Sequence, residues 1–501
     1  MARVAIIKLF SGLNIAPAQL SGELIRAGHD SRIIYFKEFH NRRMDEDWGN
    51  MVYGDTAAPV YTSGGEKMFW GLYKPFTEPD YEKLISYLRE FRPQALAFCA
   101  HVGIVDETNL VAKRLRQAFP EAVFVVGGAA PTLEPERFTD AFDLICNDEG
   151  EEVIVEMANA IEAGLPVRGI YGTWYCPTGC EIEKNPRRPR VDLDKIAMPD
   201  WDMSRYAFIN ERKIFPNRYP PNLIPFGKKE YPLMTQRGCP FSCSFCFESA
   251  YQDMHGKGVR RRHWQLILDE LLWAKEHIQP DAILFMDDVF TLNVRWLKEF
   301  LPRYKEQIGL PFWAYTYPTT HDPEILALLK DSGCHSLTMG VQTGSERLLE
   351  LYNRPTQIKR VIEAGKEVVD AGIEGLFDLI TVGPHDTEED LRLTFEFLLE
   401  FPQEFRSLGF GHMALLPKYK LTDIVASDSK PAKGFLCHSP IDDKTYDYYH
   451  KLYRLTRTET PRDVVRAIGD DPQYREDPSL LDNFLVSSGW NASYWFRSIT
   501  S

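Results

Sequence analysis

The stretch Arg237-Gly-Cys239-Pro-Phe-Ser-Cys243-Ser-Phe-Cys246 places three cysteines in one short loop of this 501-residue chain. Their spacing is Cys-x3-Cys-x2-Cys, directly after the apolar run Tyr231-Pro-Leu-Met-Thr235. Three neighbouring thiols cannot all pair as disulfides, but thiolates can share a zinc ion or an iron–sulfur cluster. Zinc needs a fourth ligand at short spacing; the next cysteine is Cys334, and the nearest histidine is His255 on a glycine-flanked segment. A four-iron cluster held by three cysteines would instead leave one iron open to a small molecule.

This loop resembles the cluster-binding motif of the radical S-adenosyl-L-methionine (SAM) superfamily. The resemblance implies a 4Fe-4S cluster on Cys239, Cys243 and Cys246, with SAM chelating the open iron. Phe245 occupies the aromatic position that lies against the adenine of SAM in that family. The alternative is a zinc knuckle or three unrelated core thiols.

Composition limits the class of protein further. The chain is 44% hydrophobic and 26% charged, as is ordinary for a soluble globular protein, and its length predicts two to four domains. A net charge of −14 argues against sequence-independent binding of nucleic acid. We expect a cytoplasmic protein, because nine cysteines make no disulfide framework and we find neither a signal peptide nor a membrane span.

The first part of the chain alternates strand and helix patterns. Strands are predicted at 4–10, 31–36, 95–100 and 122–126, and helices at 16–27, 80–91 and 106–119. This alternation predicts an α/β domain over 1–165 with a doubly wound, Rossmann-like parallel sheet and a surface insertion at 41–79. Ligands of such sheets bind beyond the carboxyl ends of the strands, which points to the loops 8–14, 100–105 and 127–133.

Two turns at that edge resemble the cobalamin-binding domain that precedes many radical SAM cores. They are Val125-Val-Gly-Gly-Ala-Ala-Pro-Thr132 and Leu144-Ile-Cys-Asn-Asp-Glu-Gly-Glu151. The resemblance implies that cobalamin is contacted by Gly127, Gly128, Pro131, Thr132, Glu149 and Gly150. Glycine suits this role because it tolerates positive φ and lets backbone approach a bulky ligand. The Asp-x-His-x-x-Gly signature is missing, so the cobalt would lack a histidine lower ligand. The alternative is a flavodoxin-like domain without cofactor.

The middle and end of the chain complete the predicted architecture. Residues 166–228 are predicted to be a linker, since Pro, Gly and charge are frequent there. Six strand–helix units follow within 229–429 and predict a partial (β/α)6 barrel of TIM type, the radical SAM core. The tail at 430–501 is predicted to be a small, mostly helical segment that caps the substrate. We interpret Cys176 and Cys180 in the linker as incidental thiols.

Polar residues follow the predicted barrel strands, where a SAM site is expected. Carboxylates at Asp287 and Asp288 suit the methionyl ammonium, although Asp288 could equally cap a helix. Met339-Gly-Val-Gln-Thr-Gly-Ser-Glu346 resembles the strand-four motif that contacts ribose and methionyl carboxylate. Its polar members are Gln342, Ser345 and Glu346. Arg354 matches an arginine of the family whose fork can pair a carboxylate.

Together the resemblances imply a cobalamin-dependent methyltransferase, which methylates an unactivated carbon through a 5′-deoxyadenosyl radical and methylcobalamin. They also imply a small-molecule or peptide substrate and an electron donor of the flavodoxin or ferredoxin type. No catalytic residue is assigned. Some relatives use the same two domains for oxidative cyclisation or ring contraction, and the sequence does not separate these reactions from methylation. A cofactor-sensing regulator would need an output module such as a basic helix-turn-helix, and we find no such segment.

Overall fold

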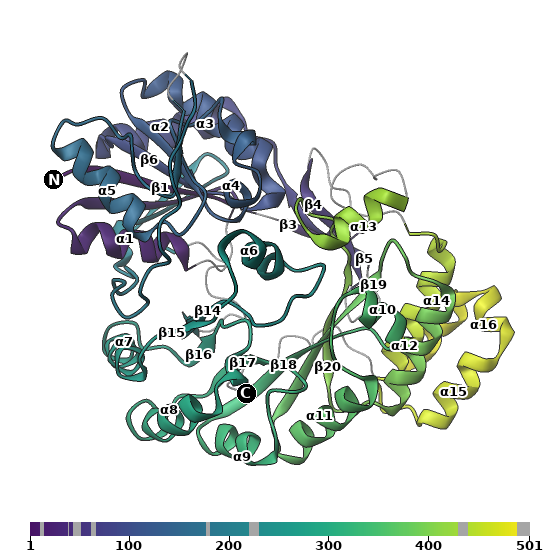
Figure 1. The fold of residues 1–501 in the computed structure, drawn as a ribbon. Coiled ribbons are helices and arrows are strands. Elements are labelled where there is room, and N and C mark those ends of the chain that lie inside the picture. Colours follow the sequence, from purple (N-terminus) through teal and green to yellow (C-terminus); the bar gives the residue numbers. More distant parts are fainter. Residues whose placement is uncertain are drawn as a thin grey trace. The chain divides into compact units, whose positions relative to one another are not determined.

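The computed structural model describes residues 1–10, 15–38, 40–43, 52–61, 67–176, 181–219, 230–428 and 439–487. The chain divides into two compact units (Figure 1). Unit 1 comprises Met1–Arg42, Asp47–Ala57 and Trp70–Pro225, and unit 2 comprises Arg43–Glu46, Ala58–Phe69 and Phe226–Ser501. Residues 11–14 of a candidate ligand loop, and Cys180, lie outside the described residues.

Unit 1 contains a doubly wound sheet, which confirms the predicted fold class. Five strands run parallel in the order β8 (Leu144–Cys146), β7 (Val123–Gly127), β6 (Ala95–Cys99), β1 (Arg3–Leu9) and β2 (Asp30–Phe36). The chain leaves β1 first towards β2 and then returns to β6 on its other side. The topological switch point therefore lies between β1 and β6, where sheets of this kind bind ligands.

Amphipathic helices cover this sheet. They are α1 (Ala16–Arg26), α2 (Glu78–Phe91), α3 (Val105–Ala118), α4 (Ala129–Leu133) and α5 (Glu151–Glu162). Helix α2 begins at a capping box, in which the Asp80 carboxylate accepts the Thr77 N–H at 3.0 Å. Its apolar residues Leu84 and Leu88 are fully buried in one core with Ile7, Phe98 and Phe124, so burial of this stripe fixes the helix on the sheet.

The interval 166–228, predicted as a linker, contains short strands that extend the sheet of unit 1. β9 (Thr173–Tyr175) and β10 (Glu183–Lys184) lie at one edge, and β11 (Tyr206–Asn210) and β12 (Lys213–Pro216) at the other. These strands have two to five residues each, too few for a clear two-residue periodicity. Tertiary pairing with β8 and β2, rather than local pattern, orders them.

Unit 2 contains the predicted partial barrel. Six strands run parallel in chain order: β13 (Glu230–Leu233), β16 (Ala282–Phe285), β17 (Phe312–Thr316), β18 (Cys334–Gln342), β19 (Glu374–Val382) and β20 (Arg406–His412). The sheet continues from β20 into β4 (Val52–Tyr61), which is antiparallel to it, and then into β5 (Lys67–Tyr73) and β3 (His40–Arg43). The expected surface insertion thus supplies strands to this sheet.

The two faces of the barrel sheet differ. The outer face is covered by α7 (Trp264–His277), α8 (Val294–Gln307), α9 (Pro323–Asp331), α11 (Ile358–Asp370) and α12 (Glu388–Glu400) (Figure 1). Phe285 and Phe312 point to these helices, since both rings lie within 6 Å of the Tyr304 ring on α8 (5.9 and 5.3 Å). Alternate residues such as Trp313 and Tyr315 face the opposite, inner side and are only partly covered.

The described part of the tail is mostly helical, as predicted. It contains α14 (Asp443–Leu455), α15 (Arg462–Asp470), α16 (Pro472–Glu476) and α17 (Leu481–Ser487), preceded by α13 (Lys420–Asp428). Helix α14 packs on α12, and the Tyr453 hydroxyl donates to the Leu391 carbonyl at 2.8 Å. Among the described helices, none combines the length and apolar character needed to cross a membrane.

Candidate functional site

The cysteine loop lies in unit 2 between β14 (Gln236–Arg237) and α6 (Phe247–His255). Gly238 opens it with a φ of +97°, and a Cβ there would lie 2.6 Å from the Gly258 carbonyl oxygen. Only glycine fits such a position. The Cys246 N–H donates to the Cys243 carbonyl at 3.1 Å, and the Gln252 side-chain amide on α6 donates to the Phe241 carbonyl at 3.1 Å. These contacts hold the loop in place.

The three thiols influence one another. Burial, together with the charges of Asp288, Cys246 and Cys243, raises the pKa of Cys239 to about 12. Burial likewise raises the pKa of Cys246 to about 11, with Cys243 and Asp288 again contributing. All three cysteines are free. The loop therefore holds a compact group of thiols that need a positively charged partner to ionise.

The donor set fits a four-iron cluster better than a single zinc ion. Within the part of the chain that the structure describes, no three His, Cys, Asp or Glu side chains are grouped closely enough to hold a metal ion. A cluster does not require such convergence, because its thiolates bind different irons. Cys334 offers no fourth thiolate, since it is buried at the amino end of β18 with its Sγ 3.6 Å from the Ser336 carbonyl oxygen.

Arg354 lies against the loop. Its Nη1 is 3.7 Å from the Cys243 Sγ, and its Nη2 donates to the Gly340 carbonyl. Its guanidinium also lies over the Tyr317 ring at 4.7 Å, and Tyr317 stacks on Phe241 of the cysteine loop at 3.9 Å. Sequence reasoning predicted Arg354 but missed Tyr317, whose only signal is its place just after β17.

Gln342 belongs to the same group. It ends β18 with a φ of +74°, an uncommon conformation for a residue with a side chain and one that concentrates at functional sites. A Cβ built on Gly340 would lie 2.7 Å from the Gln342 amide nitrogen and 3.4 Å from Arg354 Nη2. The two predicted SAM residues Gln342 and Arg354 therefore converge beside Cys243.

The paired aspartates after β16 have different surroundings. Asp287 is fully buried and accepts the N–H groups of Thr235 and Gln236 at 2.6 and 3.0 Å. It thereby supports the segment that leads into the cysteine loop. Asp288 is exposed to solvent although protein surrounds it on most sides, and burial followed by the charge of Glu248 raises its pKa to about 7. Asp288, rather than Asp287, is the carboxylate whose charge acts on Cys239 and Cys246.

Three other predicted SAM residues have partners within unit 2. The Phe245 ring meets Tyr352 edge-on, with centroids 5.3 Å apart. Ser345 is fully buried, where its Oγ caps α10 (Glu346–Leu351) and donates to the Asp390 carboxylate at 2.5 Å. Glu346 accepts the Ile358 N–H at the start of α11 at 2.9 Å. Contacts of these residues with SAM stay predictions.

In unit 1, the predicted glycines lie at the carboxyl end of β7. Gly128 has a φ of +112°, and a Cβ there would lie 2.5 Å from the Ala100 carbonyl oxygen. Close packing against the residue that follows β6 therefore requires glycine at position 128, whether or not a ligand binds. The Thr132 hydroxyl donates to the Gly128 carbonyl at 2.8 Å, and Pro131 is buried in the same short helix. Because the Thr132 hydroxyl is already used within the turn, a ligand here would contact the backbone of the turn.

The second predicted turn and a buried lysine occupy the same edge of the sheet. Glu149 accepts the Val191 N–H at 2.9 Å, and Gly150 precedes α5 with Leu20 packed 3.3 Å from where a Cβ would lie. Lys8 at the end of β1 is 5% exposed, and burial lowers its pKa to about 8. It lies at the switch point between β1 and β6, and no local sequence pattern indicates that this lysine is buried.

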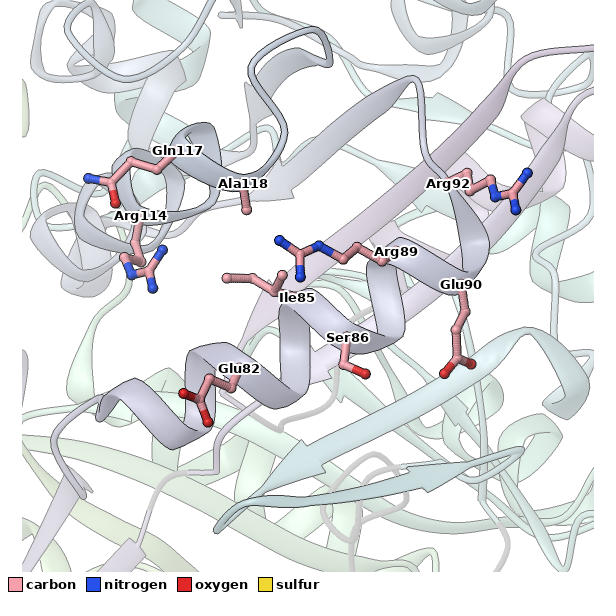
Figure 2. Close-up of a pocket in the computed structure, with 9 residues that line it drawn as sticks. All are labelled: Glu82, Ile85, Ser86, Arg89, Glu90, Arg92, Arg114, Gln117 and Ala118. Carbon is pink, nitrogen blue, oxygen red and sulfur yellow. The ribbon is translucent and has the colours of Figure 1, made fainter.

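The groove of about 660 Å³ in Figure 2 is not part of either candidate site. It lies along the C-terminal halves of α2 and α3, which run back to the amino ends of the strands. The ligand loops follow the opposite, carboxyl ends. Its lining residues are Glu82, Ile85, Ser86, Arg89, Glu90, Arg92, Arg114, Gln117 and Ala118.

Comparison with known proteins identifies the core of unit 2. Residues 233–398 match the radical SAM superfamily. A methyltransferase of Pyrococcus horikoshii, itself uncharacterized, is 27% identical over 336 residues, which span 66% of this chain and 69% of the relative. The anaerobic magnesium-protoporphyrin IX monomethyl ester cyclase of Cereibacter sphaeroides is 26% identical over 334 residues. That match spans 63% of this chain and half the length of the cyclase.

Solved structures that share the fold include those of OxsB and TsrM. The cobalamin-dependent SAM radical enzyme OxsB, with aqua-cobalamin and SAM bound, superposes with a TM-score of 0.66 at 14% identity, covering 99% of this chain and 78% of OxsB. The radical SAM methyltransferase TsrM from Kitasatospora setae, with cobalamin and a [4Fe-4S] cluster bound, gives 0.62 at 16% identity, covering 85% of this chain and 75% of TsrM.

These findings define the class. The chain carries a radical SAM domain, which implies SAM and a 4Fe-4S cluster as cofactors. Its fold is that of the cobalamin-dependent radical SAM enzymes, and its relatives include proteins named as methyltransferases and cyclases.

Proposed function

We propose that this protein is a cobalamin-dependent radical SAM methyltransferase that methylates an unactivated carbon of a small-molecule or peptide substrate. The observation that carries the proposal is the loop of Cys239, Cys243 and Cys246, with Arg354 against one thiol and the charge of Asp288 acting on the other two. Transfer of a methyl group is supported by the methyltransferase relative from Pyrococcus horikoshii and by the shared fold of TsrM.

In this proposal the residues of unit 2 bind different parts of the cofactors. The three cysteines bind the cluster, Asp288 pairs with the ammonium of SAM, and Gln342 contacts its ribose or carboxylate. Phe245 supplies an aromatic face for the adenine. When bound, the cluster and SAM supply an organic radical that removes a substrate hydrogen, and cobalamin supplies the methyl group.

Unit 1 would hold cobalamin at the carboxyl edge of its sheet. Gly128 is exposed and Gly127 is half-buried there, and Pro131, Glu149 and Gly150 belong to turns at the same edge. Both solved relatives named above contain cobalamin. An electron donor of the flavodoxin or ferredoxin type completes the proposed system.

A second candidate is oxidative cyclisation or ring contraction without methyl transfer. The cyclase of Cereibacter sphaeroides favours it, because this chain matches that enzyme at a similar identity to the methyltransferase relative.

Methyl-labelled SAM separates the candidates before the substrate is known. The protein is reconstituted anaerobically with iron, sulfide and hydroxocobalamin and reduced by a flavodoxin system. The proposal expects 5′-deoxyadenosine and label in the protein-bound corrinoid. Formation of 5′-deoxyadenosine without label in the corrinoid would favour the non-methylating candidate, and formation of neither would contradict both. Cys243→Ala should abolish 5′-deoxyadenosine formation.

A further inference from the structure

Asp378 is a carboxylate on the inner face of the barrel sheet. On β19, Gly375, Phe377 and Leu379 are buried against the outer helices, and the alternate residues Leu376, Asp378 and Ile380 face inwards. Among the described residues, no hydrogen bond or ion pair reaches the Asp378 side chain. Burial raises its pKa to about 6. A partly buried carboxylate without a partner is costly to the fold, which suggests that a ligand completes it.

Two aromatic side chains face the same space from β17. The Trp313 and Tyr315 rings lie 4.6 Å apart at 66°, and the indole N–H donates to Thr338 Oγ1 at 2.8 Å. That hydrogen bond fixes the orientation of the indole ring. Tyr315 is the register partner of Thr338 on β18, and Thr338 is the register partner of Leu376 on β19. Leu376 is the inward-facing residue that precedes Asp378 on the same strand.

The intervening strand carries a glycine at the level of Asp378. Gly340 on β18 is the register partner of Asp378, and the Gln342 amide and the Arg354 guanidinium lie over it, 2.7 and 3.4 Å from where a Cβ would be. Burial raises the pKa of Tyr315, and the charges of Asp378 and then Asp288 add to the increase. Asp378 thus lies within electrostatic reach of Tyr315, on the side towards the cysteine loop.

Most of the charged groups around this space are carboxylates. The groups that act on Tyr315 and Asp288 are the carboxylates Asp378, Asp287 and Glu248. The nearby cation Arg354 is already directed to the Gly340 carbonyl and the Cys243 thiol. An anionic substrate group would be repelled here, whereas a cation would gain from both the carboxylate and the aromatic faces.

We propose that Asp378, Trp313 and Tyr315 form the substrate subsite of the barrel and bind a protonated amine of the substrate. The carboxylate accepts hydrogen bonds from the ammonium, and the two rings shield it from water. This inference rests on the proposed function, because it names the substrate class for that site.

Benzylamine, protonated at neutral pH, and its neutral analogue benzyl alcohol test the subsite directly. Binding of each to the iron-loaded protein without SAM is measured at pH 7.5 by ligand-observed NMR titration. We expect roughly tenfold tighter binding of the amine. Asp378→Asn should abolish this preference, and Tyr315→Leu should reduce it by about two- to fivefold. Asp370→Asn, the same change at an exposed position at the end of α11, should leave it intact.

The results separate the inference from the proposed function. Equal affinity of wild type for both probes, or a preference that survives in both Asp378→Asn and Tyr315→Leu, would overturn the subsite. If Asp378→Asn does not retain iron, the Tyr315→Leu titration decides alone. Failure of wild type to cleave SAM would instead count against the proposed function, since the probe titration contains no SAM.

Discussion

Replacement of Arg354 by glutamine should make the cluster harder to reduce. The guanidinium Nη1 lies 3.7 Å from the Cys243 Sγ, so a positive charge adjoins one of the cluster thiolates. Reduction adds a negative charge to the cluster, and a nearby cation stabilises the reduced state. The substitution removes this cation while keeping a side chain of similar length.

The expected size of the effect follows from that distance. Two unit charges about 4 Å apart interact by about 4 kcal/mol at an effective dielectric constant of about 20. For a one-electron couple, about 1.4 kcal/mol corresponds to about 59 mV, which sets an upper limit of roughly 170 mV. The added electron is spread over the cluster and Arg354 is partly exposed, so we expect the potential to fall by about 50–100 mV.

A potentiometric titration followed by electron paramagnetic resonance measures this shift on the reconstituted protein without SAM. Arg354→Lys keeps the charge and should restore most of the potential. Arg303→Gln is the matched control, because Arg303 also lies over an aromatic ring, at 4.3 Å from Trp264, but on the outer helix α8. An unchanged potential together with a raised KM for SAM would refute the reasoning and favour a direct contact of Arg354 with the SAM carboxylate.

Three further predictions concern stability. Ser345→Ala removes a helix cap and a hydrogen bond to the buried Asp390, and should cost unit 2 about 2–4 kcal/mol in calorimetry; an unchanged melting temperature with weakened SAM binding would make Ser345 a ligand contact instead. Gly128→Ala should destabilise unit 1 by about 2–4 kcal/mol, because a Cβ there meets the Ala100 carbonyl, and unaltered unfolding would contradict this. Asp378→Asn should stabilise the protein by about 1–2 kcal/mol at pH 7.5, because the raised pKa of about 6 means that folding penalises the ionised carboxylate. This gain should vanish below about pH 4, where the carboxyl group is protonated in both states, and a gain independent of pH would contradict it.

The regular part of the fold could be predicted because its signals are local. Helix α7 spans Trp264–His277, as its periodicity predicts, and α11 begins at the expected Ile358. The barrel strands are short apolar runs closed by turn residues, and they were also found. Strands β9 to β12 were missed, since they are too short to show a period and are ordered by pairing with distant strands.

The cysteines of the candidate site could be predicted from the sequence, whereas the roles of the polar side chains around them were harder to predict. The spacing of the cysteines is visible in sequence, whereas the hydroxyl of Ser345 and the carboxylate of Asp287 look the same whether they bind SAM or support the chain. Only the contacts with Asp390 and Thr235 show that both are used within the fold. A charged residue inside an apolar strand is visible in the sequence at Asp378. Which side chains lie beside it depends on the register of β19 on β18, which the sequence does not show.

We propose that the three-cysteine loop holds a four-iron cluster with one iron open to SAM. Mössbauer spectroscopy of the protein reconstituted with 57Fe, before and after addition of SAM, tests it most directly. We expect a four-iron cluster in which one iron site changes its spectrum when SAM is added, and loss of this cluster in Cys243→Ala. A cluster whose spectrum ignores SAM, or a protein that retains zinc and no iron, would contradict it.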